Sequence, residues 1–306
     1  MGLRIKTNTA SVNAQRHLEK STSAVQESMT KLASGSRINK SADDAAGLAV
    51  SENLRADLRS LAVAKRNAND GISLIQVAEG GLEETNNMLI RLRELAIQSA
   101  SDTISDKERA YLDQEFVQLK DEINRIAGST EFNGTRLLVG ESDLPEDMKG
   151  LANPFPLEIQ VNKDYFVDSD GLDKTNPVNV IRIDLSNLNA FTFGENSLDL
   201  GNHEEGSRVM DKVSAQHSIS AIDSAITRVS EHRAYLGAVQ NRMGSTINNL
   251  GLQIQSLTES RSRISDTDYA VETANFTKEN ILQQAGTSIL ASANSLPKVA
   301  LSLLQG

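Results

Sequence analysis

The sequence contains no cysteine and no tryptophan, and only five of its 306 residues are proline. Without cysteine, the chain can form no disulfide, no thiolate metal site and no cysteine nucleophile. Aromatic residues are absent before Tyr111, and four of the prolines lie in one central stretch: Pro145, Pro154, Pro156 and Pro177. Because proline interrupts helices, we expect helical arms on either side of a middle segment with a different structure.

Excess positive charge is also lacking, since the formal net charge is −10 at pH 7. Nucleic acids and anionic membranes attract positive surfaces, so we expect no nucleic-acid partner and no membrane insertion. No apolar run has transmembrane length, and the basic N-terminus is not followed by the apolar block of a signal peptide. If the protein is secreted, we expect a route that needs no cleaved signal peptide.

Constellations that carry chemistry are missing as well. The histidines His17, His203, His217 and His232 are scattered, which favours solvated surface side chains over metal ligands. Asp43 and Asp44 are interpreted as charges at the start of a helix and not as a catalytic pair. We therefore predict that the protein is not an enzyme and has no catalytic residue, cofactor or metal.

The N-terminal arm carries an apolar residue at every seventh position. Ser41 and Asp44 have the spacing of a helix cap, so a long helix is predicted to begin there and to run from 42 to 100. A seven-residue period keeps one face apolar along a helix. Ser105 and Glu108 form a second capping pattern, which predicts an antiparallel neighbouring helix.

The C-terminal arm repeats this design, and Ser265 with Asp268 predicts the start of a last helix. The two long seams suit each other as partners in a rod. The predicted rod core consists of Leu54, Leu61, Ile75, Leu82, Leu89, Leu236, Met243, Leu250 and Leu257.

Short apolar stripes mark both ends of the chain. Helices this rich in Ala, Ser, Thr and Asn bury little apolar surface and are marginal alone, so we expect them to fold against other molecules. The alternative is that the two stripes pack on each other within one monomer. The predicted assembly stripes are Leu18, Val25 and Leu32 near the N-terminus and Leu282, Ile289, Leu296 and Leu303 near the C-terminus.

The middle of the chain changes to a two-residue period at 157–161 and 181–185, which predicts paired strands forming a hairpin-like cap at the far tip of the rod. The predicted fold class is mainly α, a long antiparallel coiled-coil-like rod of N- and C-terminal segments with a small β-rich outer segment. We expect a terminal helical domain (1–40 and 266–306), a helical bundle (41–140 and 206–265) and a short variable segment (141–205).

Several long motifs resemble the bacterial flagellin family: LASGSRINKSADDAAGLAVSENLR (32–55), EFNGTRLL (131–138) and TKENILQQAGTSILASANSLPKVALSLL (277–304). The resemblance covers both arms and implies a structural subunit that self-assembles into the flagellar filament for swimming. It also implies extracellular location after export without a cleaved signal peptide, terminal helices that become ordered on polymerisation and line the filament channel, and an outward-facing β-rich portion.

The partners that the resemblance implies are further copies of the chain, other flagellins, an export chaperone, the filament cap and the hook-filament junction proteins. It also places Arg91, Leu95 and Glu115 in the region that a vertebrate innate receptor recognises. Arg91 and Leu95 are four residues apart and are expected on one helix face, whereas an arginine and a glutamate on adjoining helices can also be an ordinary solvated pair.

Two other functions fit parts of the pattern. A hook-filament junction protein shares weaker versions of the terminal helices, and the strength of the 32–55 motif favours a flagellin over it. A coiled-coil adaptor would explain the heptad seams alone. Loss of polymerisation on removing the C-terminal stripe distinguishes a flagellin from the adaptor.

Overall fold

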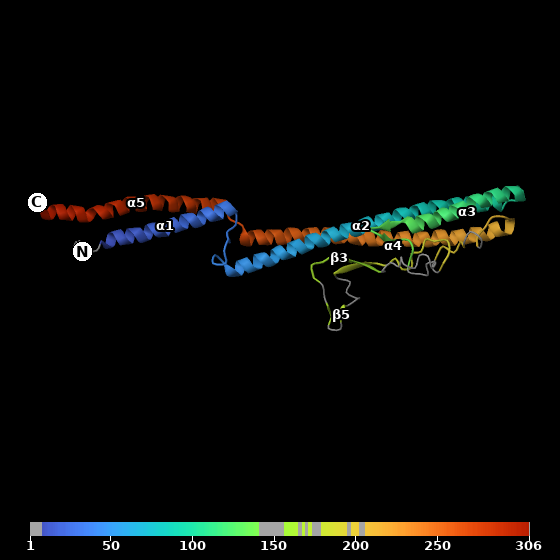
Figure 1. Cartoon of the computed structure of the whole chain (residues 1–306), viewed down its shortest axis with the longest axis horizontal. Helices are drawn as coiled ribbons and strands as arrows, with labels where there is room; N and C mark the ends of the chain where they lie inside the picture. Colours follow the sequence, from blue (N-terminus) through green and yellow to red (C-terminus); the bar gives the residue numbers. More distant parts are fainter. Residues whose placement is uncertain are drawn as a thin grey trace. The chain divides into compact units, whose positions relative to one another are not determined.

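The computed structural model describes residues 8–140, 156–164, 167–168, 171–172, 179–194, 197–201 and 206–305. These ranges contain five helices: α1 (Thr9–Ser34), α2 (Ala45–Ser99), α3 (Asp106–Ser129), α4 (Lys212–Ser265) and α5 (Tyr269–Gln305). The same ranges hold three two-stranded antiparallel sheets. The prediction of a mainly helical fold with a small β-rich portion is confirmed (Figure 1).

The chain divides into two compact units. Unit 1 comprises Met1–Leu58 and Gln255–Gly306, and unit 2 comprises Arg59–Ile254. Unit 1 therefore contains α1 and α5, unit 2 contains α3 and the strands, and both α2 and α4 pass from one unit into the other. These divisions lie inside the long helices, and the predicted domain boundaries stay a prediction.

In unit 2, α2 is antiparallel to both of its helical neighbours (Figure 1). Two ion pairs to α4, Arg93–Asp223 at 2.6 Å and Glu79–Arg233 at 3.8 Å, join residues whose numbers run in opposite directions. Helix α3 returns along α2 after a short turn. The predicted antiparallel arrangement is therefore present in this unit.

The packed face of α2 has two interleaved seams. The predicted seventh-position seam includes Leu61, Ile75, Leu82 and Leu89, each at most 1% exposed. Buried residues also occupy the positions three residues later, and there they are mostly small: Ala64, Gly71, Ala78, Thr85, Leu92 and Ser99. Small side chains let the neighbouring helices approach closely, so both seams keep a 3-4 spacing.

The predicted rod-core residues are not all equally covered. Leu236, Met243 and Leu250 on α4 are buried like their counterparts on α2. Leu54 and Leu257, which belong to unit 1, are only half-buried.

Helix starts agree with the sequence at α3 and differ from it elsewhere. The predicted capping box is confirmed at α3, where Glu108 Oε2 accepts the Ser105 backbone N–H at 2.8 Å. Helix α2 begins at Ala45, directly after Asp44, because Asp44 Oδ1 itself accepts the Gly47 N–H at 2.8 Å. Helix α5 likewise begins after Asp268, whose carboxylate accepts the N–H of Ala270. The predicted starts at Ser41 and Ser265 were wrong because the charged residue of each pattern is the cap.

Three strand pairs form antiparallel sheets in the middle of the chain. Strands β1 (Glu131–Phe132) and β2 (Thr135–Arg136) are joined by Asn133 and Gly134, with φ of 51° and 80°, a turn that needs a left-handed backbone at both positions. Strand β3 (Leu157–Gln160) pairs with β6 (Val180–Ile183), which confirms the predicted pairing of the two alternating segments. Strand β4 (Val167–Asp168) pairs with β5 (Gly171–Leu172).

The β3–β6 sheet packs against the middle of the long helices. A Cβ atom built at Gly71 of α2 would lie 2.4 Å from Ile159 Cδ1 and 2.8 Å from Met243 Cε of α4. The missing side chain of Gly71 therefore leaves room for Ile159. The prediction of a cap at the far tip was wrong, because this glycine provides a socket near the centre of α2.

The chain after β6 contributes to the core of unit 2. Leu185, Leu188 and Leu200 are at most 2% exposed, although this stretch has little regular structure. The Ala190 N–H donates to Leu138 O at 2.9 Å, which ties the stretch to the chain after α3. The described part of the predicted outer segment is thus partly a core element.

Candidate assembly surface and recognition cluster

Helices α1 and α5 form an antiparallel pair whose contact surface mixes polar groups with small and half-buried apolar side chains. Asn8 Nδ2 donates to Ala293 O at 2.7 Å, and Gln283 Nε2 donates to Thr22 Oγ1 at 3.2 Å. Leu18 lies over Gly286, its Cδ1 3.4 Å from where a Cβ would be. The α5 surface that faces α1 therefore buries few apolar side chains.

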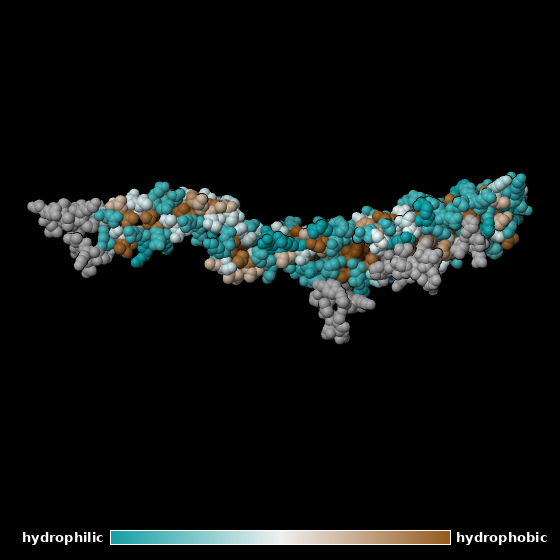
Figure 2. Space-filling view, viewed as in Figure 1, coloured by the Kyte–Doolittle hydropathy of each residue, from teal (hydrophilic) through white to brown (hydrophobic). Residues whose placement is uncertain are grey.

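The apolar stripe of α5 remains on the surface. Leu282 is 45% exposed and Ile289 is 60% exposed, and their neighbour Ile281 is also 60% exposed. Figure 2 shows hydrophobic patches along the α1 and α5 pair. On α1, by contrast, Leu18, Val25 and Leu32 are half-buried, and the side chains of Leu296 and Leu303 lie outside the described residues. The two helices pair within one chain, but the described stripe of α5 stays uncovered.

Arg91 and Glu115 form a surface ion pair between α2 and α3. Arg91 Nη2 lies 2.8 Å from Glu115 Oε1, and Arg91 Nη1 lies 2.9 Å from Glu94 Oε2. The hydrogen bonds that the Arg91 guanidinium donates to Glu115, and then to Glu94, raise its pKa. Both ends of the main pair are about half exposed, so a binding partner can reach them.

Leu95 is not part of that accessible surface, because it is only 1% exposed. It packs in the core of unit 2 next to Leu92 and Ala96, whereas Arg91 lies just outside the seam. Although Arg91 and Leu95 are only four residues apart on α2, the core of unit 2 covers Leu95 and leaves Arg91 exposed. A spacing of four residues left open which side of α2 the core would occupy.

Sequence reasoning missed a set of buried charges on α3. Lys120 is 1% exposed, and its Nζ donates to Leu200 O at 2.9 Å and to Ser207 O at 3.2 Å. Burial, helped by the charge of Arg208, lowers the pKa of Lys120 to about 8. Asp113, 3% exposed, accepts from Arg208 Nη2 at 2.6 Å. These groups hold the chain that leads into α4 against α3.

His232 also departs from the sequence expectation of a solvated histidine. It lies between the seam positions Val229 and Leu236 of α4 and is half-buried. Burial lowers its pKa. His17 and His217 are exposed as expected, and His203 lies outside the described residues. The seam spacing of α4 is the signal that could have identified position 232.

Neither a metal centre nor a membrane span is found in the described part of the chain. No group of three or more His, Asp or Glu side chains there could hold a metal ion. No helix in the same ranges is both long and apolar enough to cross a membrane.

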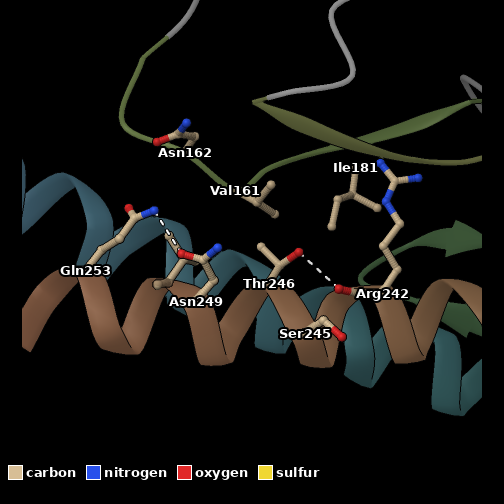
Figure 3. A pocket seen from close by; sticks show the side chains of 9 residues that line it. Val161, Asn162, Ile181, Arg242, Ser245, Thr246, Asn249 and Gln253 are labelled. Atoms are coloured by element: carbon tan, nitrogen blue, oxygen red, sulfur yellow. Dashed lines mark hydrogen bonds between the residues drawn. The ribbon is translucent and has the colours of Figure 1, made fainter.

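An open cavity of about 430 Å³ lies between the β3–β6 sheet and α4 (Figure 3). Val161, Ile181 and Leu250 supply its apolar surface. Its polar side chains are largely uncharged and partly bonded within α4, where Gln253 Nε2 donates to Asn249 Oδ1 at 2.9 Å. This set can contact an apolar group flanked by amides, and the lining contains no carboxylate or imidazole beside the hydroxyls of Ser245 and Thr246.

Both arms match models of the same protein family. The family model of the bacterial flagellin N-terminal helical region matches residues 5–143, and that of the bacterial flagellin C-terminal helical region matches residues 219–304.

Relatives named flagellin match almost the whole chain. The chain is 40% identical to the flagellin of Halalkalibacterium halodurans, over 98% of this chain and 99% of the relative. It is also 40% identical to the flagellin of Bacillus subtilis, over 99% of this chain and 100% of the relative. A solved structure assigned to a flagellar hook-associated protein from Vibrio parahaemolyticus has a TM-score of 0.56 and covers 73% of this chain and 100% of that one, at 14% identity. That last likeness shows the fold alone.

Proposed function

Because the chain belongs to the bacterial flagellin family and is a structural subunit of the flagellar filament, we propose that α1 and α5 complete their packing only against other copies. In the free subunit these helices are marginal, and on polymerisation they become ordered and line the filament channel. Folding is then coupled to assembly, so the ordering entropy is offset by contacts between subunits.

The exposed stripe of α5 carries this proposal. Leu282 and Ile289 lie seven residues apart on one helix face and leave much of their apolar surface in water. Burying such surface contributes roughly 25 cal/mol per Å². A neighbouring copy that covers the stripe supplies the burial that α1 does not.

A double substitution, Leu282→Ser with Ile289→Ser, tests the proposal. We expect the monomer to unfold at the same urea concentration as the unchanged protein, while seeded polymerisation no longer yields long filaments in electron microscopy. Gln284→Ala, exposed on the same helix but away from the stripe, serves as the control and should polymerise normally. Filaments of ordinary length from the double variant would refute the proposal.

Membership of the family supports a proposal for the remaining partners and for the export route. The subunit is exported by the flagellar secretion apparatus without a cleaved signal peptide, and it meets an export chaperone, the filament cap and the hook-filament junction proteins on its way. Its working surfaces are assembly surfaces, and it catalyses no reaction. A hook-filament junction role is less well supported, because the hook-associated structure shares only 14% identity whereas the filament flagellins share 40%.

Arg91 and Glu115 are proposed as the contact for the vertebrate innate receptor of flagellin, with Leu95 supporting them from the core. Their half-exposed side chains and direct ion pair favour this role. Arg91→Ala is expected to lower activation of receptor-bearing reporter cells by monomeric protein. Arg93→Ala, which removes a similarly exposed ion pair with Asp223, is the matched control. Equal activation by both variants would count against the assignment.

A further inference from the structure

The two interruptions of the helical arms are bonded to each other in unit 1. Residues 35–44 separate α1 from α2, and residues 266–268 separate α4 from α5. Ser36 and Asp266 form an antiparallel bridge. The Thr267 N–H donates to Gly35 O at 3.0 Å, and the Arg37 N–H donates to Ser265 O at 2.7 Å. The backbones of the two breaks are therefore hydrogen-bonded to each other over a short antiparallel stretch.

A side chain in or directly after each break also caps a helix of the opposite arm. The last carbonyl groups of a helix have no partner within it. At the end of α4, Ile264 O accepts Arg37 Nη2 at 2.7 Å. Near the end of α1, Leu32 O accepts the Tyr269 hydroxyl at 3.1 Å. Gly35, with φ of 69°, brings its own N–H to Lys31 O at 2.9 Å. The N-terminal arm thus completes α4, and the C-terminal arm completes α1.

These contacts share one antiparallel register with the rest of the helix pair. Residue 32 meets 269 and residue 35 meets 267 at the breaks, and farther along residue 22 meets 283 and residue 11 meets 294. The partners are more than 220 residues apart in sequence, as in Arg37 and Ile264 with a separation of 227. Once the breaks are joined, every later α1–α5 contact closes only a short loop, which costs much less entropy.

We propose that these reciprocal caps, the cross-arm clamp of Gly35, Arg37, Thr267 and Tyr269, are the point from which α1 and α5 pair in register. The clamp makes the two arms order together, so neither terminal helix is completed alone. This inference rests on the proposed function, since it names how the ordering that accompanies assembly is started. The clamp then regulates assembly by presenting the α5 stripe on a helix already paired with α1.

Two substitutions each remove one hydrogen bond of the clamp and keep the rest of the side chain. Tyr269→Phe removes only the hydroxyl that caps α1, and Arg37→Met keeps the stem and removes the donor that caps α4. Tyr111→Phe, on a residue that is 61% exposed, and Arg263→Met, whose guanidinium donates to Ser260 in its own helix, are the matched controls.

Hydrogen exchange followed by mass spectrometry is the measurement, on monomers and on seeded filaments. Tyr269→Phe is expected to speed exchange in the last turn of α1, on the other arm, by about ten-fold, the loss of one net hydrogen bond. Arg37→Met should do the same in the last turn of α4. The controls should change neither. Acceleration confined to the arm that carries the substitution would overturn the clamp.

The outcome is separable from that of the proposed function. If α1 and α5 of the unchanged monomer are already protected from exchange, the proposal that they become ordered on assembly is refuted. The faster exchange on the arm opposite the substitution can then still be measured in the monomer. If they exchange freely in the monomer, the effect is read in filaments, which both single variants are expected to form when seeded. Filaments with normal exchange in both variants again overturn the clamp.

Discussion

The α2 seam in unit 2 is covered within the chain, whereas the α5 stripe in unit 1 is not. Leu82 and Leu89 are at most 1% exposed, while Leu282 and Ile289, at the same seven-residue spacing, are 45% and 60% exposed. The difference lies in which face of the helix meets its neighbours. The α2 seam faces apolar residues of α3, α4 and the β3–β6 sheet, whereas α5 turns Gln283 and Gly286, and not its apolar stripe, toward α1. An apolar period therefore identifies a stripe without identifying what covers it.

The largest expected contrast comes from truncating one leucine in each unit. Leu89→Ala leaves a cavity in a packed core and should lower the free energy of unfolding by about 2–5 kcal/mol. Leu282→Ala removes a side chain that is 45% exposed and leaves no closed cavity, so it should change monomer stability by less than about 0.5 kcal/mol. Urea unfolding of the two monomers measures both. Similar losses would show that the α5 stripe is covered in the monomer after all.

A pH dependence is expected from unit 2, because the charged side chains that are buried in the described residues, Arg109, Asp113 and Lys120, all belong to it. The pKa of Lys120 is about 8 in the folded chain against an ordinary value of 10.5. Between these values the unfolded chain binds the proton and the folded chain does not, so stability rises with pH.

Relative to Lys120→Met, the unchanged protein should therefore gain about 3 kcal/mol of unfolding free energy between pH 8 and 10.5, and nothing below pH 7. Parallel denaturation series on the two proteins measure the difference and cancel the other titrating groups. A difference that is flat with pH would mean that Lys120 is solvated.

Two glycines of unit 2 should respond in opposite directions to the same substitution. At Gly206, φ is 114° and a Cβ would lie 2.5 Å from Gly201 Cα, so Gly206→Ala should destabilise the unit by about 1–3 kcal/mol. At Gly80 of α2 a Cβ meets nothing within 4 Å, so Gly80→Ala should stabilise by about 0.5–1 kcal/mol through helix propensity. Thermal unfolding followed by circular dichroism compares them. Equal shifts would argue against close packing of Gly206 on Gly201.

The smallest effect is expected in unit 1. Within the described residues, Thr267 Oγ1 is buried without a hydrogen-bond partner. Thr267→Val removes this hydroxyl at nearly constant shape, and it should leave stability unchanged or raise it by less than about 1 kcal/mol. Filament melting temperature is the readout. A clear loss of stability would reveal a partner for the hydroxyl in the filament.

Much of the fold was accessible from the sequence because leucine and isoleucine at heptad spacing are a strong signal. That signal predicted α2, α4 and their antiparallel pairing, and alternation predicted the β3–β6 pair. The second seam was not predicted, because Ala64, Gly71 and Ala78 have little apolar character of their own.

The candidate sites were less accessible. Burial of Leu95 depends on which side of α2 meets the core, and a four-residue spacing does not decide it. Lys120 and Asp113 read as surface residues, since burying a charge is unfavourable unless polar partners surround it. Those partners come from residues 200–209, far away in sequence, and no local pattern announces them.

The register of β3 and β6 places Gln160 directly opposite Val180. A segment inserted between the two strands therefore begins and ends at neighbouring points of the sheet, about one strand spacing apart. A foreign peptide or a whole folded module grafted there would require no change in the length or phase of any helix. The subunit can in this sense serve as a scaffold for display: the inserted sequence can vary while the helices that form the polymer stay the same.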